Sequence, residues 1–177
     1  MVSAYRKDMC LNRVTALATH RYSTTGMEEN VLQKLTNTQN DPMLGFARLV
    51  LGLVFFAHGA QKMLGWFGGA GFSGTMSGFT QMGVPAAPTF LVIFIEFFGG
   101  LSMLFGLLSR LAGLGITTLM IGAILMVHYR FGFFMNWMGQ KKAEGFEYHL
   151  LAIALAVLVL VRGAGAFSID RLIAGRR

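Results

Sequence analysis

The chain has 177 residues, of which 54% are hydrophobic and only 13% are charged, and it is rich in glycine (23) and methionine (12). A soluble globular domain seldom combines so much apolar surface with so little charge, so the composition indicates a membrane protein whose solvent is the lipid bilayer. The net charge of +7 does not predict nucleic-acid binding, because the basic residues lie in the tails and between the hydrophobic runs, without a basic stripe interleaved with aromatics.

The first 42 residues form a polar tail that lacks an apolar run long enough for a signal peptide. We expect this tail to be largely disordered, and Met27 and Met43 are alternative translation starts. Cys10 is the single cysteine, so an intramolecular disulfide and a CxxC motif are excluded. The predicted organisation is a tail over residues 1–42, a four-helix membrane domain over 43–172 and a basic C-terminal tail over 173–177.

Four hydrophobic runs follow the tail; the first three are near the length of about 20 residues that a membrane-spanning helix needs, and the fourth is the shortest. The first covers residues 43–64, the second follows Pro85 and Pro88 and continues to Leu108, and the others cover 111–129 and 147–161. The very short connection at Ser109 and Arg110 forces the second and third runs to be antiparallel. The predicted fold is therefore an all-α integral membrane protein, an antiparallel bundle of four transmembrane helices.

Basic residues near the ends of the runs predict the orientation of this multi-pass bundle. They are more numerous on the side of the two termini (Lys34, Arg48, Arg110, Arg162, Arg171, Arg176, Arg177) than on the other side (Lys62, Arg130, Lys141, Lys142). Because Lys and Arg are enriched in cytoplasmic connections, both termini are predicted to be cytoplasmic.

Glycine spacing in the first run predicts which face packs against another helix. Gly45, Gly52 and Gly59 recur every seven residues and so lie on one stripe, where small side chains let helices approach closely.

The connection between the first two runs, residues 65–84, contains no Asp, Glu, Lys or Arg. Met76, Phe79 and Met82 repeat at three-residue steps after Ser73, a residue type that caps helices. This pattern predicts a short interfacial helix, capped by Ser73, between spans one and two.

Ionisable side chains in the apolar runs are candidate functional residues, because a charge at mid-membrane costs about 2.5–3.5 kcal/mol on insertion scales. Glu96 lies near the middle of the second run. The remaining candidates gather at one end of an antiparallel bundle: His58, Lys62, His128, Arg130, Glu147 and His149. Together these residues predict a polar path that leads inward from the outer face to Glu96, with proton-handling roles for Glu96, His58 and His128.

Metal or haem chemistry has less support in the sequence. His58 and His128 project from different runs at comparable depth, so a b-type haem between them is an alternative that we do not favour. Zinc would need three or four ligands, and although His58, His128, Glu147 and His149 are of the right types, no HxxxH or ExxH spacing occurs on a predicted helix. We predict no metal site and no intrinsic cofactor.

Six segments in order resemble the DoxX family of small four-helix bacterial membrane proteins, over about three-quarters of the chain. They are HGAQKMLG (58–65), FSGTMSGFTQMGVPAAP (72–88), IEFFGGLSMLFGLLSRLAG (95–113), VH (127–128), FEYHLLAIALA (146–156) and GAGAFSID (163–170). The resemblance implies a bacterial inner-membrane protein linked to quinone or quinol redox chemistry or to oxidative-stress defence, and ligand-binding roles for His58, Lys62, Glu96, His128 and Glu147. His149 and the N-terminal tail depart from the family pattern.

Three functions remain open at this stage. The leading hypothesis is a polar pocket in the outer half of the bundle that binds a quinone or quinol head group, in an accessory subunit whose redox partner carries the electron-transfer centre. The alternative is a non-catalytic membrane scaffold or assembly partner, in which the polar residues only hold the helices together. A small-solute transporter is less favoured, because a single four-helix unit shows no inverted repeat. The lipid bilayer is a predicted partner in every case, and a homo-oligomer stays open.

Overall fold

The computed structural model describes residues 31, 33–139 and 142–175. It divides into two compact units, Met1–Lys34 and Leu35–Arg177. Most of the predicted disordered tail, including Cys10 and Met27, lies outside the described residues.

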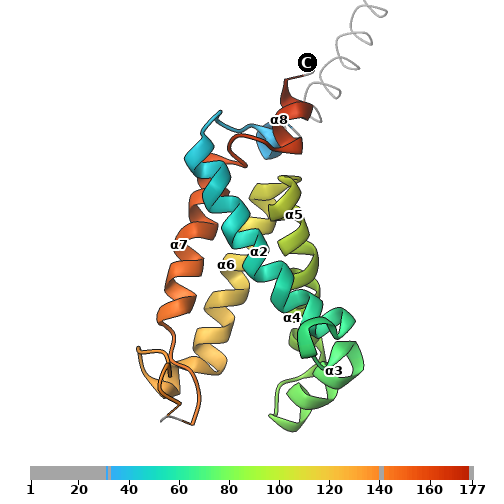
Figure 1. Ribbon diagram of the computed structural model, residues 1–177, viewed down its shortest axis with the longest axis vertical. Helices are drawn as coiled ribbons and strands as arrows, with labels where there is room; N and C mark the ends of the chain where they lie inside the picture. The colour runs from blue at the N-terminus through green and yellow to red at the C-terminus, as the bar shows by residue number, and fades with distance from the viewer. Residues whose placement is uncertain (1–30, 32, 140–141, 176–177) are drawn as a thin grey trace, which may run out of the picture. The chain divides into compact units, whose positions relative to one another are not determined.

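The second unit is built from helices and their connections, and its described part contains no strand, which confirms the all-α prediction. Its elements are α2 (Pro42–Leu64), η1 (Trp66–Gly68), α3 (Gly71–Gln81), α4 (Ala86–Phe94), the π-helical turn η2 (Ile95–Gly99), α5 (Gly100–Phe105), α6 (Ser109–Met126), η3 (His128–Phe131), α7 (Glu147–Arg162) and α8 (Ile169–Ala174). Figure 1 shows α8 at one end of the unit and α3 at the other. We call these the proximal end and the distal end.

In the part of the chain that the structure describes, three helices are long and apolar enough to cross a membrane: α2, the continuous stretch Ala86–Phe105 formed by α4, η2 and α5, and α6. They confirm the first three predicted hydrophobic helices in outline. The connection between the second and third lies at residues 106–108 and not at Ser109 and Arg110 as predicted, because Gly106 and Leu108 adopt the left-handed conformation that ends the helix, and both predicted turn residues belong to α6. The third is shorter than predicted, because α6 ends at Met126 and His128 lies on the separate turn η3. The helix α7 begins at Glu147 as predicted, but its 16 residues make it shorter than the other three.

Local signals explain where α2 begins and ends. The Asp41 carboxylate accepts hydrogen bonds from the backbone N–H groups of Met43 and Leu44, and Pro42 occupies the first turn, where a missing N–H costs nothing. At the other end Gly65 adopts a left-handed conformation with φ of 75°, a common helix stop. In contrast, Ser73 is not a helix cap as predicted, because α3 already begins at Gly71 and Ser73 lies inside it.

The glycine stripe of α2 packs against backbone, as its spacing predicts. A Cβ atom at Gly59 would overlap the backbone of Phe97 in η2, and one at Gly52 would lie 2.7 Å from the backbone nitrogen of Leu104 in α5. Gly45 fits equally closely against Ala166. Figure 1 shows α6 and α7 side by side, and the buried core lies between these helices and α2.

A buried arginine holds the proximal end together. Arg48 on α2 is fully buried, and its guanidinium donates hydrogen bonds to the backbone oxygens of Ala164, Met103, Leu104 and Phe167. These carbonyls belong to α5 and to the connection between α7 and α8. One side chain therefore ties three parts of the unit together.

Asp170 on α8 lies beside this arginine and is also buried. Its carboxylate accepts hydrogen bonds from the N–H groups of Leu108 (2.7 Å) and Ser109 (2.9 Å). These N–H groups are at the start of α6, where a helix has no internal acceptors for them and where negative charge is stabilised. Asp170 therefore caps α6 from a residue about sixty positions away in the sequence.

The segment just before α2 is hydrogen-bonded to this end of the unit. Thr38 accepts a hydrogen bond from the N–H of Gly165, Gln39 from the side chain of Arg162, and the backbone oxygen of Asn37 from Arg110. The packed part of the chain thus extends several residues before the α2 helix.

Candidate functional site

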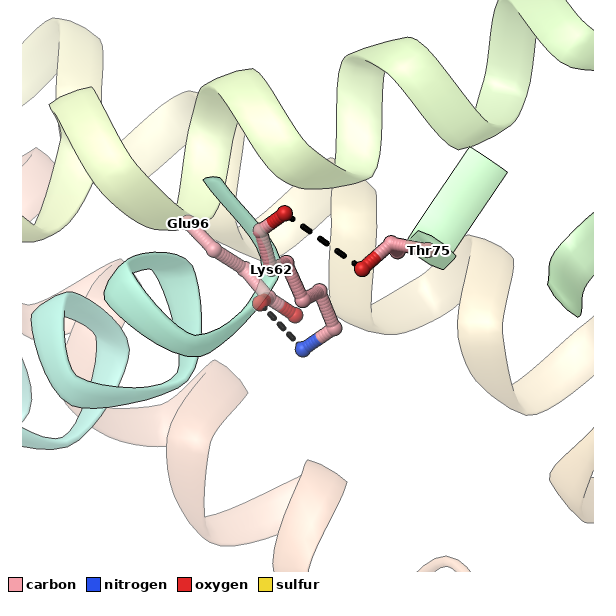
Figure 2. A network of polar contacts seen from close by, with 3 residues as sticks. All are labelled: Lys62, Thr75 and Glu96. Carbon is pink, nitrogen blue, oxygen red and sulfur yellow. Dashed lines mark hydrogen bonds and ion pairs between the residues drawn. The ribbon is translucent and has the colours of Figure 1, made fainter. Parts of the chain in front are cut away.

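An ion pair joins the first and second long helices towards the distal end. Lys62, in the last turn of α2, donates a hydrogen bond from Nζ to Oε2 of Glu96 at 2.5 Å (Figure 2). The Glu96 side chain is 10% exposed and that of Lys62 is 22% exposed. The carboxylate at mid-helix, which the sequence left without an assigned partner, is therefore paired with a lysine.

The π-helical turn explains how this carboxylate comes to face α2. Glu96 lies in η2, where the helix widens between α4 and α5. Such turns insert one extra residue into an α-helix and are frequent at functional sites. The turn packs directly against α2 at Gly59, and a Cβ at Gly100 would overlap the backbone of Phe56 from the other direction. The close backbone approach leaves the Lys62 and Glu96 side chains within reach of each other.

The helix α3 is hydrogen-bonded to α2 next to this ion pair. The Thr75 hydroxyl donates a hydrogen bond to the backbone oxygen of Lys62 at 3.3 Å, and Thr75 is the buried residue of α3 (Figure 2). This oxygen is one of the last carbonyls of α2, which have no partner within the helix. The contact fixes the backbone from which the Lys62 side chain extends.

Tyr148, in the first turn of α7, approaches the pair from another helix. It packs against the hydrophobic core and lies close enough to Glu96 for the two groups to interact electrostatically. The sequence reasoning did not select this tyrosine. Its position directly after Glu147, a selected residue, is the one signal that could have drawn attention to it.

Two histidines meet beside Tyr148. The rings of His128 on η3 and His149 on α7 lie with their centroids 4.1 Å apart, and the Tyr148 ring contacts that of His149 edge-on at 5.6 Å. Nδ1 of His128 lies 2.9 Å from the backbone oxygen of Glu144 and so carries the proton in that contact. His149 is 7% exposed, and within the described part of the chain its Nδ1 has no hydrogen-bond partner.

The remaining predicted site residues stand apart from these groups. His58 is exposed on α2, and Glu147 accepts a hydrogen bond of 3.3 Å from the indole of Trp137 in the loop before α7. The structure thus brings Lys62 to Glu96 and His128 to His149, and among the described residues no hydrogen bond, ion pair or ring contact joins His58 or Glu147 to either pair. Among the described residues no group of three or more His, Cys, Asp or Glu side chains could hold a metal ion.

Comparison with known proteins identifies the family. The DoxX family model matches residues 43–129. The inner membrane protein YqjF of Escherichia coli (strain K12) is 33% identical over 127 residues, which cover 72% of this chain and 88% of that protein. The protein named "Putative oxidoreductase CatD" of Bacillus subtilis (strain 168) is 32% identical over 108 residues, covering 61% of this chain and 71% of its own length.

A longer alignment reaches a mycobacterial protein. The "Uncharacterized membrane protein Rv3486" of Mycobacterium tuberculosis (strain ATCC 25618 / H37Rv) is 28% identical over 160 residues, covering 86% of this chain and 94% of that protein. No solved structure matches the chain. The matched region contains α2, the second long helix with Glu96, and α6, and the chain is a membrane protein of the DoxX family.

Proposed function

We propose that this protein binds the head group of a quinone or quinol at the Lys62–Glu96 pair and acts as an accessory subunit of a quinone-linked oxidoreductase. The observation that carries the proposal is this ion pair, almost buried on a π-helical turn of an apolar helix. A charged pair in such a place is costly and is a functional candidate by default. The name of the Bacillus subtilis relative, an oxidoreductase, agrees with a redox role.

The chemistry of a quinone suits this pair. Each quinone oxygen accepts a hydrogen bond, and reduction to quinol adds a proton at each oxygen. Lys62 supplies donor N–H groups, and Glu96 is a titratable group beside them that can exchange a proton with the ligand. The surrounding apolar helices would accommodate the ring and the tail. Because the sequence predicts no intrinsic cofactor, electrons would come from a partner subunit, and His128 would take part from the distal end.

The same proposal includes a fourth span. The 16 residues of α7 would extend about 24 Å, which is shorter than a hydrocarbon core of about 30 Å. The helix nevertheless packs along α6 and contributes Ala152, Ala156 and Val159 to the core. We place α7 across the bacterial inner membrane beside α6, α3 at the interface, and both termini in the cytoplasm, as the basic residues favour.

Tryptophan fluorescence provides the test. Trp66 packs edge-on against Phe56, which packs on Phe97, the residue after Glu96, so a bound quinone should quench its emission. The variant Trp137→Phe removes the signal of a tryptophan that is 84% exposed in the loop between η3 and α7, which we call the distal loop. Titration of this variant in lipid nanodiscs with decylubiquinone should give saturable quenching.

Substitutions in the pair then decide the assignment. Losing a hydrogen bond to a charged group costs about 1.5–3 kcal/mol, so Lys62→Met and Glu96→Gln should each weaken binding by about 10- to 100-fold. Lys142→Met, at an exposed lysine of the distal loop, should bind as the parent does. Absence of saturable quenching in the Trp137→Phe protein would refute the proposal. The ion pair would then only hold the two helices together, as the scaffold hypothesis states.

A further inference from the structure

We propose that the proximal end of the bundle carries a binding site for the phosphate head group of an anionic phospholipid, formed by Arg110, Arg162 and Arg171. The three arginines lie on different helices, at the start of α6, at the end of α7 and on α8. In the sequence they predicted only the orientation of the bundle. The inference concerns the end opposite the Lys62–Glu96 pair and does not depend on the proposed quinone binding.

All three guanidinium groups donate hydrogen bonds to one short segment, residues 37–40, which precedes α2. Arg110 donates from Nε at 3.2 Å and from Nη2 at 3.0 Å, and Arg162 donates from Nε at 3.0 Å. The acceptors for Arg110, Arg162 and Arg171 are, in that order, the backbone oxygen of Asn37, Oε1 of Gln39 and Oδ1 of Asn40. Because four residues extend over at most about 14 Å, the three positive charges are gathered at one place.

The acceptors of these arginines are neutral, so their positive charge is not compensated. Two carboxylates lie near them in the sequence, and both have other partners. Asp41 accepts hydrogen bonds from N–H groups at the start of α2, and the buried Asp170 accepts them from N–H groups at the start of α6. Among the described residues none of the three arginines forms an ion pair with a carboxylate. Since Arg162 and Arg171 are exposed, the cluster presents an excess of positive charge at the surface.

The two exposed arginines keep most of their N–H donors available. A guanidinium carries five N–H donors in a planar fork. Within the described part of the chain, Arg162 uses only Nε and Arg171 uses only Nη1. The fork matches the oxygens of a phosphate group, which it binds through two parallel hydrogen bonds. Charged donors from α7 and α8 are therefore available to an anionic phosphate at this place.

Apolar side chains beside the arginines favour a phospholipid over free phosphate. Each arginine is next in the sequence to an apolar residue that is more than half exposed: Leu111 beside Arg110, Val161 beside Arg162 and Leu172 beside Arg171. Arg110 also lies in the first turn of α6, a helix long and apolar enough to cross a membrane, so the cluster lies where the bilayer surface is expected. The head-group phosphate would contact the cations and the acyl chains would contact the apolar side chains, as in basic lipid sites between membrane helices.

Native mass spectrometry of the full chain in a non-ionic detergent tests the site. The probe is dioleoylphosphatidylglycerol, and the reference is dioleoylphosphatidylcholine, which has the same acyl chains and no net charge. We expect saturable binding of the anionic lipid, about tenfold or more tighter than that of the reference. Arg162→Gln and Arg171→Gln each remove a charged donor and should weaken this binding by about tenfold or more. Lys142→Met, which removes a positive charge from the distal loop, should bind as the parent does.

Two further measurements separate lipid binding from other roles of the cluster. Asn40→Ala removes the acceptor of Arg171 but keeps the positive charge, so it should retain the affinity of the parent. A loss as large as that in Arg171→Gln would show that the segment is only structural, and would overturn the site. Inorganic phosphate at the concentration of the lipid should not displace it, because displacement would assign the cluster to free phosphate. Equal affinity for the two lipids, or parent affinity in both glutamine variants, would also refute the proposal.

Discussion

Replacing Arg48 with methionine should destabilise the bundle more than any other single loss of charge at the proximal end. The guanidinium is fully buried and donates to four backbone oxygens, and it lies beside the buried Asp170. Methionine keeps much of the side-chain volume, but it leaves those oxygens without their donor and the Asp170 carboxylate without its counter-charge.

The size of the effect follows from these contacts. A hydrogen bond to a charged group contributes about 1.5–3 kcal/mol, and a buried polar group left without its partner costs about 1–3 kcal/mol. The four bonds share one guanidinium, so their contributions are not additive. We expect the free energy of unfolding to fall by about 4 kcal/mol in Arg48→Met, which is in the range that single substitutions seldom reach.

Equilibrium unfolding in mixed micelles, followed by circular dichroism, measures this loss. Arg162→Met is the matched control, because Arg162 is exposed at the same end and bonds to the side chain of Gln39. A double-mutant cycle with Asp170→Asn then isolates the coupling between the two buried charges. If the free energies of unfolding of Arg48→Met and Arg162→Met differ by less than about 1 kcal/mol, the hydrogen bonds of the Arg48 guanidinium do not stabilise the bundle as its contacts indicate.

Three further predictions use the same unfolding assay. Asp170→Asn should lower the free energy of unfolding by about 1–2 kcal/mol, because the charged cap on the start of α6 is lost, and an unchanged value would contradict the capping role. Gly59→Val should destabilise strongly, since its Cβ would overlap backbone, whereas Gly122→Val should be tolerated because nothing lies within 4 Å of that position. Lys62→Met should destabilise more than the double variant Lys62→Met/Glu96→Gln, because the single change leaves a carboxylate unpaired; equal losses would show that the pair is not coupled.

Hydropathy and small-residue spacing were sufficient to predict the three long apolar helices and the packing face of the first. Lipid requires every backbone group in a span to be bonded within the helix, so a long apolar run has few alternatives to a helix. Spacing of glycines by seven residues likewise leaves one face bare of side chains, and Gly52 and Gly59 contact backbone there. Helix ends were less accurate, because the break after Met126 depends on the backbone hydrogen bonds by which Phe146 and Glu147 hold Gly132 and Phe133, rather than on composition.

The site was predicted less completely, for two physical reasons. The π-helical turn that aims Glu96 at Lys62 arises where two backbones pack together at Gly59, and no local sequence rule encodes it. Arg48 was assigned to membrane orientation, although it lies well inside an apolar run and the rule that selected Glu96 applies to it equally. Tyr148 was not considered, because a tyrosine near a membrane interface is common and its importance here depends on what faces it.

The two ends of the bundle use their polar groups differently, and this difference supports placing function at the distal end. At the proximal end the buried charges of Arg48 and Asp170 have backbone partners and lie beside each other, which is the arrangement of a structural tie. At the distal end the buried carboxylate of Glu96 has a single partner that is partly exposed, and His149 keeps a ring nitrogen free among the described residues. Charged groups selected only for stability would be expected to satisfy one another, as Arg48 and Asp170 do, although the Ser109 hydroxyl at that end has no partner among the described residues. Polar atoms left open inside an apolar bundle lower its stability, and the exchange of protons with a ligand gives a physical reason for keeping them.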